Sequence, residues 1–522
     1  MTRVVVSDVS YRYPGAASPA LDRVSLEVEP GEFVVLAGAS GTGKSTLLRA
    51  VAGLVPHFHG GEFAGRVQVG EMDTRDQGPG ELAAQVATLF QDPETQVVMG
   101  TVRAELAFPL ENRGWSEAAV ARAVEETALA LGIDALLDRS TAQLSGGELQ
   151  RAALGATLAG RPSVVCLDEP TSQLDPVAGD ELVGLLRRLN EDLELTVLLA
   201  EHRLERCLGV ADRVVVLDGG RVAFDGAPDG FLGWAVKEAP ALATPGARLL
   251  AGVGVAPVPG VRRARLAMRE KGQLPVEVSF NGPYPRQMTP RAEEALKFHR
   301  VWHEIKNGPT ILRGLSFTAK QGERIALMGR NGAGKSTLLR HAAGLLKPTR
   351  GNLQAQGRVA LLLQNPNDYL VHDRVKDEAP AAALERFHLS HLAARHPRDL
   401  SGGEKQRLAL AIVLGDPADP PAVLCLDEPT RGMDRHVKDE LVTLLTGLEA
   451  SVIVATHDPE FAALFADRVM LMGDGRIIAD GSPREVLAGG TYFATEVARI
   501  LDGAALTAVQ GIALLTKQEV PA

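Results

Sequence analysis

Cysteine is scarce in this sequence. Only three of its 522 residues are cysteines, and their positions follow neither a disulfide pattern nor a metal-ligand spacing. A chain of this kind suits a reducing cytosol. Cys166 and Cys425 each lie inside a short apolar run, so we expect both to be buried core thiols.

A signal peptide and a membrane span are also missing from the pattern. The first residues lack the apolar core of a signal peptide, and no stretch approaches the roughly 18 uninterrupted apolar residues of a membrane helix. We therefore expect that any work at a membrane depends on docking to another protein that spans it.

Excess positive charge is absent as well. The formal net charge is −10. Nonspecific binding to nucleic acid depends on a basic patch or stripe. We expect no nucleic-acid partner, although the overall charge does not exclude a local basic patch.

What the sequence does contain is a long internal repeat. The segment GASGTGKST at 38–46 recurs as GRNGAGKST at 329–337, LSGGE at 144–148 recurs at 400–404, and CLDEPT at 166–171 recurs at 425–430. The order is the same in both halves, which indicates duplication of a whole domain. The second half is shorter between its first and second motifs, where we expect a strand arm and a helical insert.

The remaining pattern divides the chain into two domains and two connecting or terminal segments. We predict a first domain at 1–235 and a second at 286–497. Prolines and glycines interrupt the pattern from 236 to 285, which predicts a linker. Residues 116–131 have helical apolar spacing, and so does the tail at 498–522, which is either a packed terminal helix or a docking helix.

Each glycine-rich segment fits the pattern G-x-x-x-x-G-K-[ST]. It follows an apolar strand (33–36 or 324–327) and precedes a helix. Such a loop turns backbone N–H groups toward phosphates at the positive end of a helix. Lys44 and Lys335 would neutralise phosphate charge, and Ser45 and Ser336 would bind Mg²⁺. A plain glycine turn is the alternative, but two matches in the same context argue against it.

An acidic pair follows an apolar strand in each half. Asp168 and Asp427 would lie at the coordination sphere of the metal, and Glu169 and Glu428 would act as general bases on the attacking water. A solvated acid pair is the alternative.

The Ser-Gly-Gly segments are the most discriminating feature. Ser145, Gly146 and Gly147, with their copies at 401–403, would start a helix and present N–H groups and a hydroxyl as a second anion site. A single copy would more simply be a helix cap. The phosphate loop of each half already holds its own ATP, so the ATP of the other half is the natural target.

These motifs resemble those of the ATP-binding cassette (ABC) ATPases, over nearly the whole chain apart from the linker and tail. The resemblance implies an α/β fold with two P-loop nucleotide-binding domains, each with a RecA-like core, an antiparallel β arm and a helical subdomain. It also implies a head-to-tail pseudo-dimer within one chain, with two ATPs at the interface. Each phosphate loop would then face the signature segment of the other half.

The same resemblance assigns further roles. Gln91 and Gln364 match the loop that contacts Mg²⁺ and senses a membrane partner, and His202 and His457 match the switch histidine near the γ-phosphate. Asp175 and Asp434 fit the loop after the acidic strand. Tyr13 matches the aromatic residue that stacks on adenine, with Trp302 as a weak choice for its counterpart.

The predicted sites are then as follows. The catalytic residues are Glu169, His202, Gln91, Glu428, His457 and Gln364. The metal ligands are Ser45, Gln91, Asp168, Ser336, Gln364 and Asp427. The ATP-binding residues are Tyr13, Gly38, Ala39, Ser40, Gly41, Thr42, Gly43, Lys44, Ser45, Thr46, Ser145, Gly146, Gly147, Gly329, Arg330, Asn331, Gly332, Ala333, Gly334, Lys335, Ser336, Thr337, Ser401, Gly402 and Gly403.

Both halves keep every hydrolytic residue, so we predict two competent ATPase sites. The segment at 431–434 departs from its counterpart at 172–175, which makes unequal rates plausible.

Short matches at 90–96, 201–203 and 11–15 look like the energy-coupling-factor (ECF) importers for vitamins, cobalt or nickel. This branch implies a peripheral position on the cytoplasmic face of the cell membrane. Its partners would be an integral-membrane T-component and a substrate-binding S-component. A soluble tandem ABC ATPase acting on the ribosome, or a tandem sugar-importer ATPase, are the alternatives.

Overall fold

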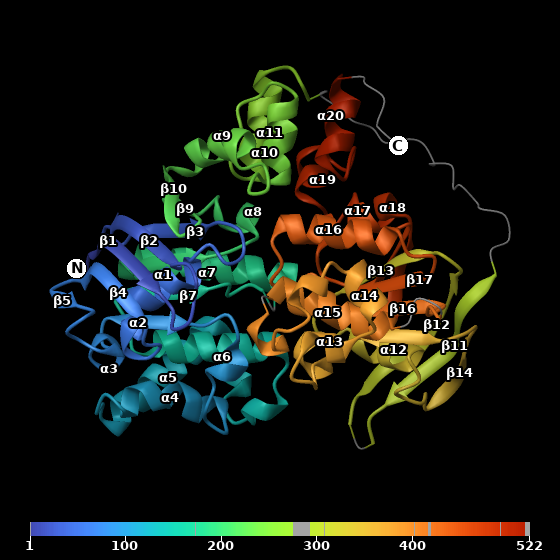
Figure 1. Cartoon of the computed structure of the whole chain (residues 1–522), viewed down its shortest axis with the longest axis horizontal. Helices are drawn as coiled ribbons and strands as arrows, with labels where there is room; N and C mark the ends of the chain where they lie inside the picture. Colours follow the sequence, from blue (N-terminus) through green and yellow to red (C-terminus); the bar gives the residue numbers. More distant parts are fainter. Residues whose placement is uncertain are drawn as a thin grey trace. The chain divides into compact units, whose positions relative to one another are not determined.

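The computed structural model describes residues 2–172, 174–274, 293–306, 308–400, 402–415, 419–490 and 492–516. The chain is divided into two compact units (Figure 1). Unit 1 contains Met1–Ala251 and Ala256–Ala264, and unit 2 contains Gly252–Val255 and Arg265–Ala522. Each unit is a complete α/β assembly, as the repeat predicts.

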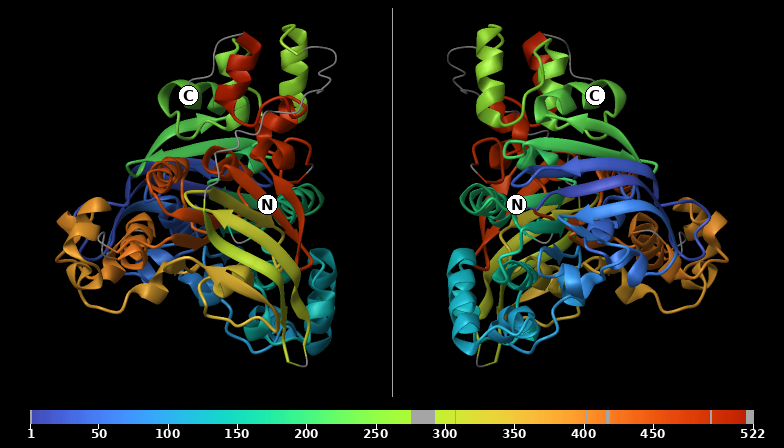
Figure 2. Two further views of the ribbon diagram at one scale, coloured as in Figure 1. Left: turned by 90° about the vertical axis from the view of Figure 1, so that its right-hand side faces the viewer. Right: turned by 90° about the vertical axis from the view of Figure 1, so that its left-hand side faces the viewer.

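Unit 1 contains an antiparallel sheet and a mainly parallel sheet. The antiparallel sheet has the order β2-β1-β4-β5, and its main strands lie side by side in Figure 2. The larger sheet has the order β10-β9-β3-β8-β7-β6, and only β10 runs antiparallel to its neighbour. The strands are β1 Val4–Arg12, β2 Leu21–Val28, β3 Phe33–Ala37, β4 Glu62–Val69, β5 Met72–Asp73, β6 Val86–Leu89, β7 Val164–Asp168, β8 Thr196–Ala200, β9 Arg213–Asp218 and β10 Arg221–Gly226.

The parallel sheet is buried on both faces. Alternate residues of a strand point to opposite faces, so Phe33 and Val35 join one apolar core while Val34 and Leu36 join the other. Continuous apolar strands are typical of such a sheet. The helices are α1 Lys44–Val51, α2 Leu54–His57, α3 Pro79–Leu82, α4 Val102–Glu111, α5 Glu117–Leu131, α6 Gly146–Ala159, α7 Pro176–Leu193, α8 Leu204–Cys207 and α9 Pro228–Glu238.

Unit 2 repeats the sheet order, with a smaller periphery. Its larger sheet is β15-β16-β17-β13-β18-β19, and its antiparallel sheet is β12-β11-β14. The strands are β11 Glu294–Glu304, β12 Thr310–Lys320, β13 Arg324–Gly329, β14 Arg350–Ala355, β15 Val359–Leu362, β16 Val423–Asp427, β17 Ser451–Ala455, β18 Arg468–Gly473 and β19 Arg476–Gly481. The helices of this domain are α12 Lys335–Ala342, α13 Val375–Glu378, α14 Ala381–Arg386, α15 Gly402–Leu414, α16 Arg435–Thr446, α17 Pro459–Phe465 and α18 Pro483–Leu487.

The shortening of the second half falls in the helical insert and the arm. Helices α4 and α5 have 10 and 15 residues, whereas α13 and α14 have 4 and 6. Between the phosphate-loop helix and the next parallel strand, unit 1 has α2, β4, β5 and α3, but the described part of unit 2 has β14 alone. The parallel core keeps its length, so the reduction affects only the surrounding elements.

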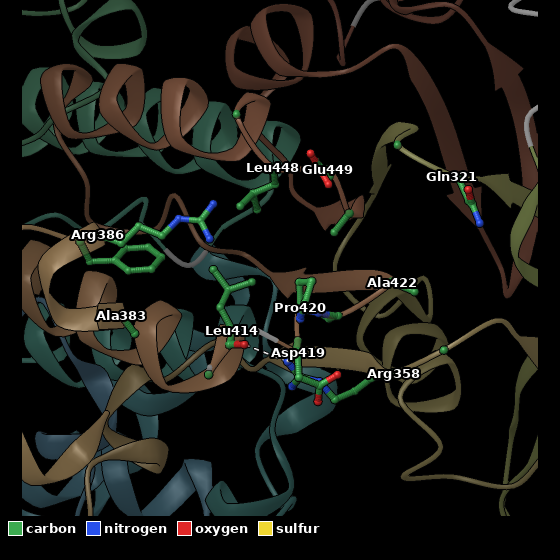
Figure 3. A pocket seen from close by; sticks show the side chains of 17 residues that line it. Gln321, Arg358, Ala383, Arg386, Leu414, Asp419, Pro420, Ala422, Leu448 and Glu449 are labelled. Atoms are coloured by element: carbon green, nitrogen blue, oxygen red, sulfur yellow. Dashed lines mark hydrogen bonds and ion pairs between the residues drawn. The ribbon is translucent and has the colours of Figure 1, made fainter. Parts of the chain in front are cut away.

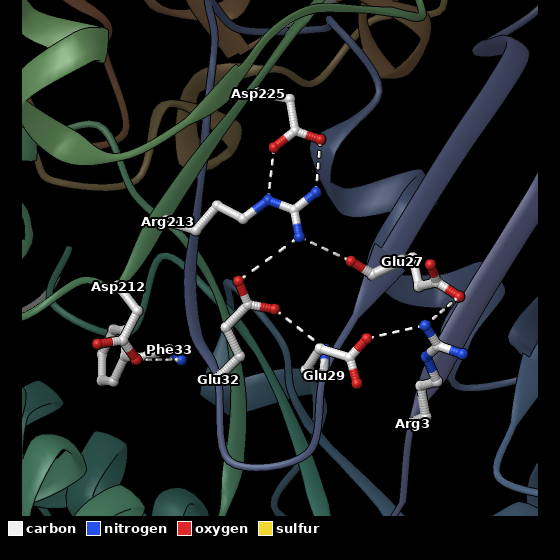
Figure 4. A network of polar contacts seen from close by, with 8 residues as sticks. All are labelled: Arg3, Glu27, Glu29, Glu32, Phe33, Asp212, Arg213 and Asp225. Atoms are coloured by element: carbon white, nitrogen blue, oxygen red, sulfur yellow. Dashed lines mark hydrogen bonds and ion pairs between the residues drawn. The ribbon is translucent and has the colours of Figure 1, made fainter.

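One partly buried arginine joins the two sheets within each unit. Arg213 of β9 pairs with Asp225 of β10 through two contacts of 2.5 and 2.6 Å, and it donates to the Glu27 carbonyl of β2 at 2.8 Å (Figure 4). Arg468 makes the same contacts in unit 2, with Asp480 and with the Thr318 carbonyl of β12. A planar guanidinium suits this role because it bonds a carboxylate through two parallel N–H groups.

The segment predicted to be an irregular linker instead contains helices. Helices α10 Pro245–Gly252 and α11 Val261–Glu270 lie within 236–285, and residues 275–285 are outside the described residues. The prolines misled the interpretation because Pro245 is the first residue of α10, where a missing N–H costs no helical hydrogen bond. Pro245 therefore marks the start of a helix and not a break in the structure.

The C-terminal tail also contains helices. They are α19 Glu496–Ile500 and α20 Ala508–Thr516, and residues 517–522 lie outside the described part. Arg265 of α11 contacts this region, because its guanidinium donates to the Arg499 carbonyl and lies 2.5 Å from Asp502. Of the helices that the structure describes, none has both the length and the apolarity required to cross a bilayer.

Candidate functional site

Four neighbouring parallel strands present the predicted residues at one edge of the sheet in unit 1. Strand β3 leads into the phosphate loop, β8 into His202, β7 into Asp168 and Glu169, and β6 into Gln91. The carboxyl ends of parallel strands share one edge, which is where α/β proteins bind their ligands. In unit 2, β13, β17, β16 and β15 place the corresponding residues in the same order.

The phosphate loops require glycine at particular positions. Gly38 and Gly43 have φ angles of 146° and 103°. A Cβ at Gly38 would lie 2.4 Å from the Leu217 carbonyl oxygen, and one at Gly43 would lie 2.4 Å from that of Ala20. Any side chain at either position would clash with backbone. The sequence pattern therefore has a steric cause.

The loop lysines point into these loops. The Nζ of Lys44 donates to the carbonyls of Gly38 and Ala39, both at 2.8 Å. The Nζ of Lys335 donates to Gly329 at 2.9 Å. Both lysines are buried at the start of their helices. A positive charge held inside a ring of backbone N–H groups is suited to binding phosphates.

Asp168 and Asp427 are buried carboxyls beside a serine hydroxyl. Burial raises the pKa of Asp168, and a hydrogen bond with Ser45 opposes this effect. Asp427 shows the same direction, with Ser336 as its partner. Among the described residues, the Oδ1 atom of Asp168 is buried without a hydrogen-bond partner.

These residues fit a hard divalent cation. A carboxylate with an unused buried oxygen beside a hydroxyl is a suitable start for Mg²⁺ coordination, because Mg²⁺ prefers oxygen ligands. Gln91 and Gln364 follow the next strands, β6 and β15, which pair with β7 and β16. Both glutamines thus follow the strand beside the acidic one, as the predicted metal site requires.

A glutamate and a histidine contact each other in each unit. The Nε2 of His202 lies 2.9 Å from Oε1 of Glu169, and the Nδ1 of His457 lies 2.7 Å from Oε2 of Glu428. Different ring nitrogens therefore face the carboxylate in the two units. Glu169 and Glu428 both have a φ of 50°, a strained value for a non-glycine residue.

Backbone hydrogen bonds hold the strained glutamates. The N–H of Glu169 donates to Ala200 at 2.9 Å, and that of Glu428 donates to Ala455 at 2.9 Å. Each bond ties the end of the acidic strand to the end of the strand that precedes the histidine. Tertiary structure thus brings the predicted general base and the predicted switch histidine into contact in both units.

The first signature segment is an exposed helix start. Ser145 caps α6, and its N–H donates to Glu148 at 2.8 Å in a capping box. Burial raises the pKa of Glu148, but hydrogen bonds from Ser145 and the charge of Arg139 outweigh it and leave the pKa below its ordinary value. Gly402 and Gly403 begin α15 in unit 2, and Ser401 lies outside the described residues.

The residues after the acidic strands cap the following helices. Asp175 accepts from the Ala178 N–H at 3.0 Å, and Asp434 accepts from that of Val437 at 3.1 Å. Both aspartates therefore hold the start of a helix, α7 or α16, directly beyond the acidic pair.

Tyr13 lies beside the phosphate-loop helix. Its hydroxyl is 3.3 Å from Oγ1 of Thr46 and accepts from Arg49 at 2.9 Å. Its ring packs edge-on against Tyr11, with centroids 4.8 Å apart. This position suits an aromatic platform for a base, as the resemblance implies.

The sheet register gives Tyr13 a different counterpart from the one expected. Tyr11 pairs with Leu21 in unit 1, and His303 pairs with Leu312 in unit 2. Two positions after this pair, the chain has Tyr13 in unit 1 and Ile305 in unit 2, beyond a register shift that follows His303. Trp302 lies on an earlier position, where Arg350 packs 5.9 Å from its ring centroid.

Sequence reasoning also gave Glu201 no role within the site. It follows the fully buried strand β8 and is itself 3% exposed. A charged residue directly after five buried strand residues was the available signal. Its partners include residues elsewhere in the chain that could not be read from local pattern.

A cavity of about 540 Å³ in unit 2 lies away from these residues (Figure 3). Its lining includes Gln321, Ala422 and Ala450, which precede β13, β16 and β17. It therefore lies at the amino-terminal edge of the sheet, opposite the phosphate loop. Arg358 in its wall donates to the carbonyls of Leu414 and Asp419 at 2.8 and 2.9 Å, which is a structural use.

Comparison with known proteins identifies the family. The family described as ABC transporter matches residues 21–172 and 312–431, once in each half. The chain belongs to the ABC transporter family. This ABC protein is an ATPase with tandem cassettes, because each matched range contains a phosphate loop and an acidic strand.

Similar proteins align with this chain over nearly their whole length. A protein of Streptomyces coelicolor, provisionally named ABC transporter ATP-binding protein, is 40% identical over 95% of this chain and 96% of its own length. One from Bacillus thuringiensis subsp. konkukian is 35% identical over 95% of each chain. The solved RNase-L inhibitor has a similar fold, with a TM-score of 0.59, 24% identity and coverage of 92% and 91%.

Proposed function

We propose that this ABC ATPase is the energy-coupling subunit of an ECF-type membrane importer for a vitamin or for cobalt or nickel. The supporting observation is a braced loop with an exposed apolar tip beside the nucleotide site. Val98, seven positions after Gln91, is 66% exposed. Isolated exposed apolar residues are common, so the argument depends on how the loop is held.

Side chains brace this loop at both ends. Gln96 accepts from the Phe90 N–H at 3.0 Å and donates to the Thr88 carbonyl at 2.9 Å. The carboxylate of Glu105 accepts from the N–H groups of Val98 and Met99 at 3.0 and 2.7 Å. Force applied at Val98 would therefore be transmitted to the strand end that carries Gln91.

The corresponding loop of unit 2 is held in place by different residues. Tyr369 accepts from the Leu363 N–H and donates to the Leu361 carbonyl, both at 2.9 Å. Its exposed tip is Val371, which is 77% exposed. Two such loops in one chain suit the docking of two helices of a T-component, which would in turn hold an S-component.

The ATP chemistry follows from the residues at the sheet edge. Lys44 and Lys335 would bind phosphates, and Mg²⁺ would be held by Ser45, Asp168 and Gln91 in the first site and by Ser336, Asp427 and Gln364 in the second. Mg²⁺ supplies charge neutralisation at the transferring phosphoryl group. Glu169 and Glu428 would take a proton from the attacking water, and His202 and His457 would hold those carboxylates in position.

We further propose that each site is completed by the signature of the other half. Ser145 and Gly146 are exposed at the start of α6, and α6 packs on α4 and α5. An exposed helix start can accept the phosphates of an ATP bound elsewhere. The chain would thus form a pseudo-dimer with head-to-tail sites, located on the cytoplasmic face of the membrane.

A soluble tandem ATPase acting on the ribosome is the competing function. The likeness to the RNase-L inhibitor, at 24% identity, concerns the fold. Helix α11 carries four arginines, at 262, 263, 265 and 269, and two of them are already engaged within the chain, which argues against an RNA site. Arg263 pairs with Asp229 at 2.8 Å, and Arg265 binds the Arg499 carbonyl and Asp502. These cations already have partners within the chain.

Affinity purification of the full chain from detergent-solubilised cells tests this function. We expect integral-membrane proteins to co-purify, and Val98→Asp together with Val371→Asp to remove them while ATP binding persists. Leu193→Asp, at an exposed apolar site on α7, is the matched control. Recovery of ribosomal proteins in place of membrane subunits would refute the importer and favour the competing function.

A further inference from the structure

Glu201 connects two loops of the first ATP site. Its Oε1 accepts from the N–H of Thr171 at 3.0 Å, and its Oε2 accepts from the N–H of His202 at 3.2 Å. Thr171 lies two residues after Glu169, on the way to Asp175. One carboxylate therefore ties the segment after the acidic strand to the loop that carries the switch histidine.

The surroundings of Glu201 are buried and charged. Burial raises the pKa of Glu201, the nearby charge of Glu169 acts in the same direction, and Arg206 of α8 opposes both. The Arg206 side chain is only 8% exposed, and its Nε lies 3.6 Å from Asp180 of α7. Cys207, also on α8, is another titratable group in this environment.

The lack of a side chain at Gly179 leaves room for Arg206. A Cβ at Gly179 would lie 2.5 Å from the Nη1 atom of Arg206, so a larger residue there would displace it. Burying a carboxylate is costly unless it is hydrogen-bonded or paired. The two backbone N–H groups and Arg206 offset that cost, which indicates that this charge has a specific structural role.

Unit 2 is built differently at the same place. Thr456 precedes the switch histidine, is fully buried, and accepts from the Asp458 N–H at 3.1 Å. The buried ion pair there joins Lys438 of α16 to Asp458 at 2.7 Å, and Asp458 also caps α17. A threonine is too short to reach both loops as Glu201 does.

We infer that Glu201 is a positioning residue of the first ATP site, which holds the segment from Glu169 to Asp175 and the His202 loop in register. This inference rests on the proposed roles of Glu169 and His202. Those two side chains lie 2.9 Å apart, each on a loop that Glu201 anchors. A displacement of about 1 Å in such a pair can reduce a rate by as much as about a hundredfold.

The consequence is that the two ATP sites are held unequally. The first depends on a carboxylate that bridges two loops, whereas the second depends on an ion pair that caps a helix. The Glu201 carboxylate bonds Thr171 and His202, which lie outside the phosphate loop, so its loss should lower kcat and leave KM for ATP nearly unchanged.

The test uses the full chain with Glu201→Gln and Glu201→Thr, the latter being the residue of unit 2. We expect Glu201→Thr to lower kcat by up to about twofold, which is the full loss when one of two equal, independent sites stops, with KM within about twofold. Glu201→Gln keeps the acceptor for Thr171 but places an amide N–H near that of His202. It should therefore give an intermediate kcat, as a partial rescue.

Hydrogen exchange provides a readout that does not depend on turnover. We expect faster exchange of the amides in 169–176 and 201–206 in Glu201→Thr, because two buried N–H groups lose their acceptor. Segments 428–435 and 456–461 of the same molecule are the internal control and should not change. If Glu201→Thr does not fold, the nearly isosteric Glu201→Gln decides the question by the same measurements.

The inference is overturned if both variants keep the parental kcat and exchange pattern, or if KM rises in step with any loss of kcat. Glu169→Gln, measured in parallel, distinguishes failure of the proposed catalytic roles from failure of the positioning role alone. If it leaves turnover unchanged, the proposed roles at the site fail. If it lowers turnover while the Glu201 variants do not, only the positioning role fails.

Discussion

The two ABC cassettes of this chain share a core and differ in what surrounds it. In both, four parallel strands present a phosphate loop, a histidine, an acidic pair and a glutamine at one edge of the sheet. The distances between glutamate and histidine are similar, 2.9 and 2.7 Å. The strained φ of 50° at Glu169 and Glu428 is identical. The two halves thus share the placement of these residues, although the histidine faces its glutamate through Nε2 in unit 1 and through Nδ1 in unit 2.

The two units differ in the residues that surround these shared residues. Unit 1 has Tyr13 beside the phosphate-loop helix, whereas the residue at the same count from the corresponding strand pair of unit 2 is Ile305. Unit 1 also has Glu201 where unit 2 has Thr456. In unit 2, His303 takes the place of Tyr11 and lies edge-on to the buried His341, with ring centroids 4.9 Å apart. Burial lowers the pKa of His341, and the neighbouring His303 acts in the same direction.

This comparison indicates that two sites with the same catalytic groups need not work equally. On the proposals above, base contact and loop positioning would be supplied by different residues in the two cassettes. The following experiments test the shared core first and the differing periphery afterwards.

Loss of the general bases should have the largest effect. We expect Glu169→Gln and Glu428→Gln each to depress ATP turnover, and the double variant to lower it by about a hundredfold or more, the contribution typical of general base catalysis. The double variant should also retain bound ATP in a closed form, detectable by gel filtration with labelled nucleotide. Glu191→Gln, exposed on α7, is the control. Turnover at the parental rate in the double variant would exclude these residues as bases.

Cross-linking tests whether the two cassettes complete each other. With Ser40→Cys and Gly402→Cys in one chain, we expect an ATP-dependent cross-link, because the signature of unit 2 would lie over the phosphate loop of unit 1. The native cysteines should not form cross-links, because all three are buried and burial raises the pKa of Cys425 to about 12. A ready cross-link between Ser40→Cys and Gly146→Cys, without the first product, would contradict head-to-tail pairing.

Exchange of the residues proposed to contact the adenine base of ATP should have the smallest effect. Stacking of a base on an aromatic ring contributes about 1–3 kcal/mol, so we expect Tyr13→Ile to weaken ATP binding at the first site by at least about fivefold. Ile305→Tyr should strengthen binding at the second site. Inorganic triphosphate, which lacks a base, is the control ligand, and titration calorimetry is the measurement. Equal affinity in parent and Tyr13→Ile would show that Tyr13 is no platform.

Much of the fold and site was predictable because the signals are local. Gly38 and Gly43 are glycines because backbone carbonyls lie 2.4 Å from where a Cβ would be, and such a constraint leaves a fixed spacing in the sequence. The buried thiols of Cys166 and Cys425 are confirmed for a similar reason, since each lies in a run of buried strand residues. The helix predicted at 116–131 is confirmed as α5.

Two predictions failed for different reasons. The helices in 236–285 were missed because prolines were interpreted as breaks, although Pro245 stands at the first position of α10, where proline is itself a local start signal. Trp302 was chosen from the sequence as the counterpart of Tyr13, but the strand pairing places it before His303, the counterpart of Tyr11.

The sequence by itself determined that this chain has two ATPase cassettes, because phosphate binding and water activation require particular residue types at short, fixed spacings. Tertiary structure alone decided which residues support those groups. Glu201 meets Thr171 only because β7 and β8 are adjacent in the sheet, and His303 corresponds to Tyr11 only through the pairing of β11 with β12. Such contacts join residues far apart in the chain, where no local spacing constrains the sequence.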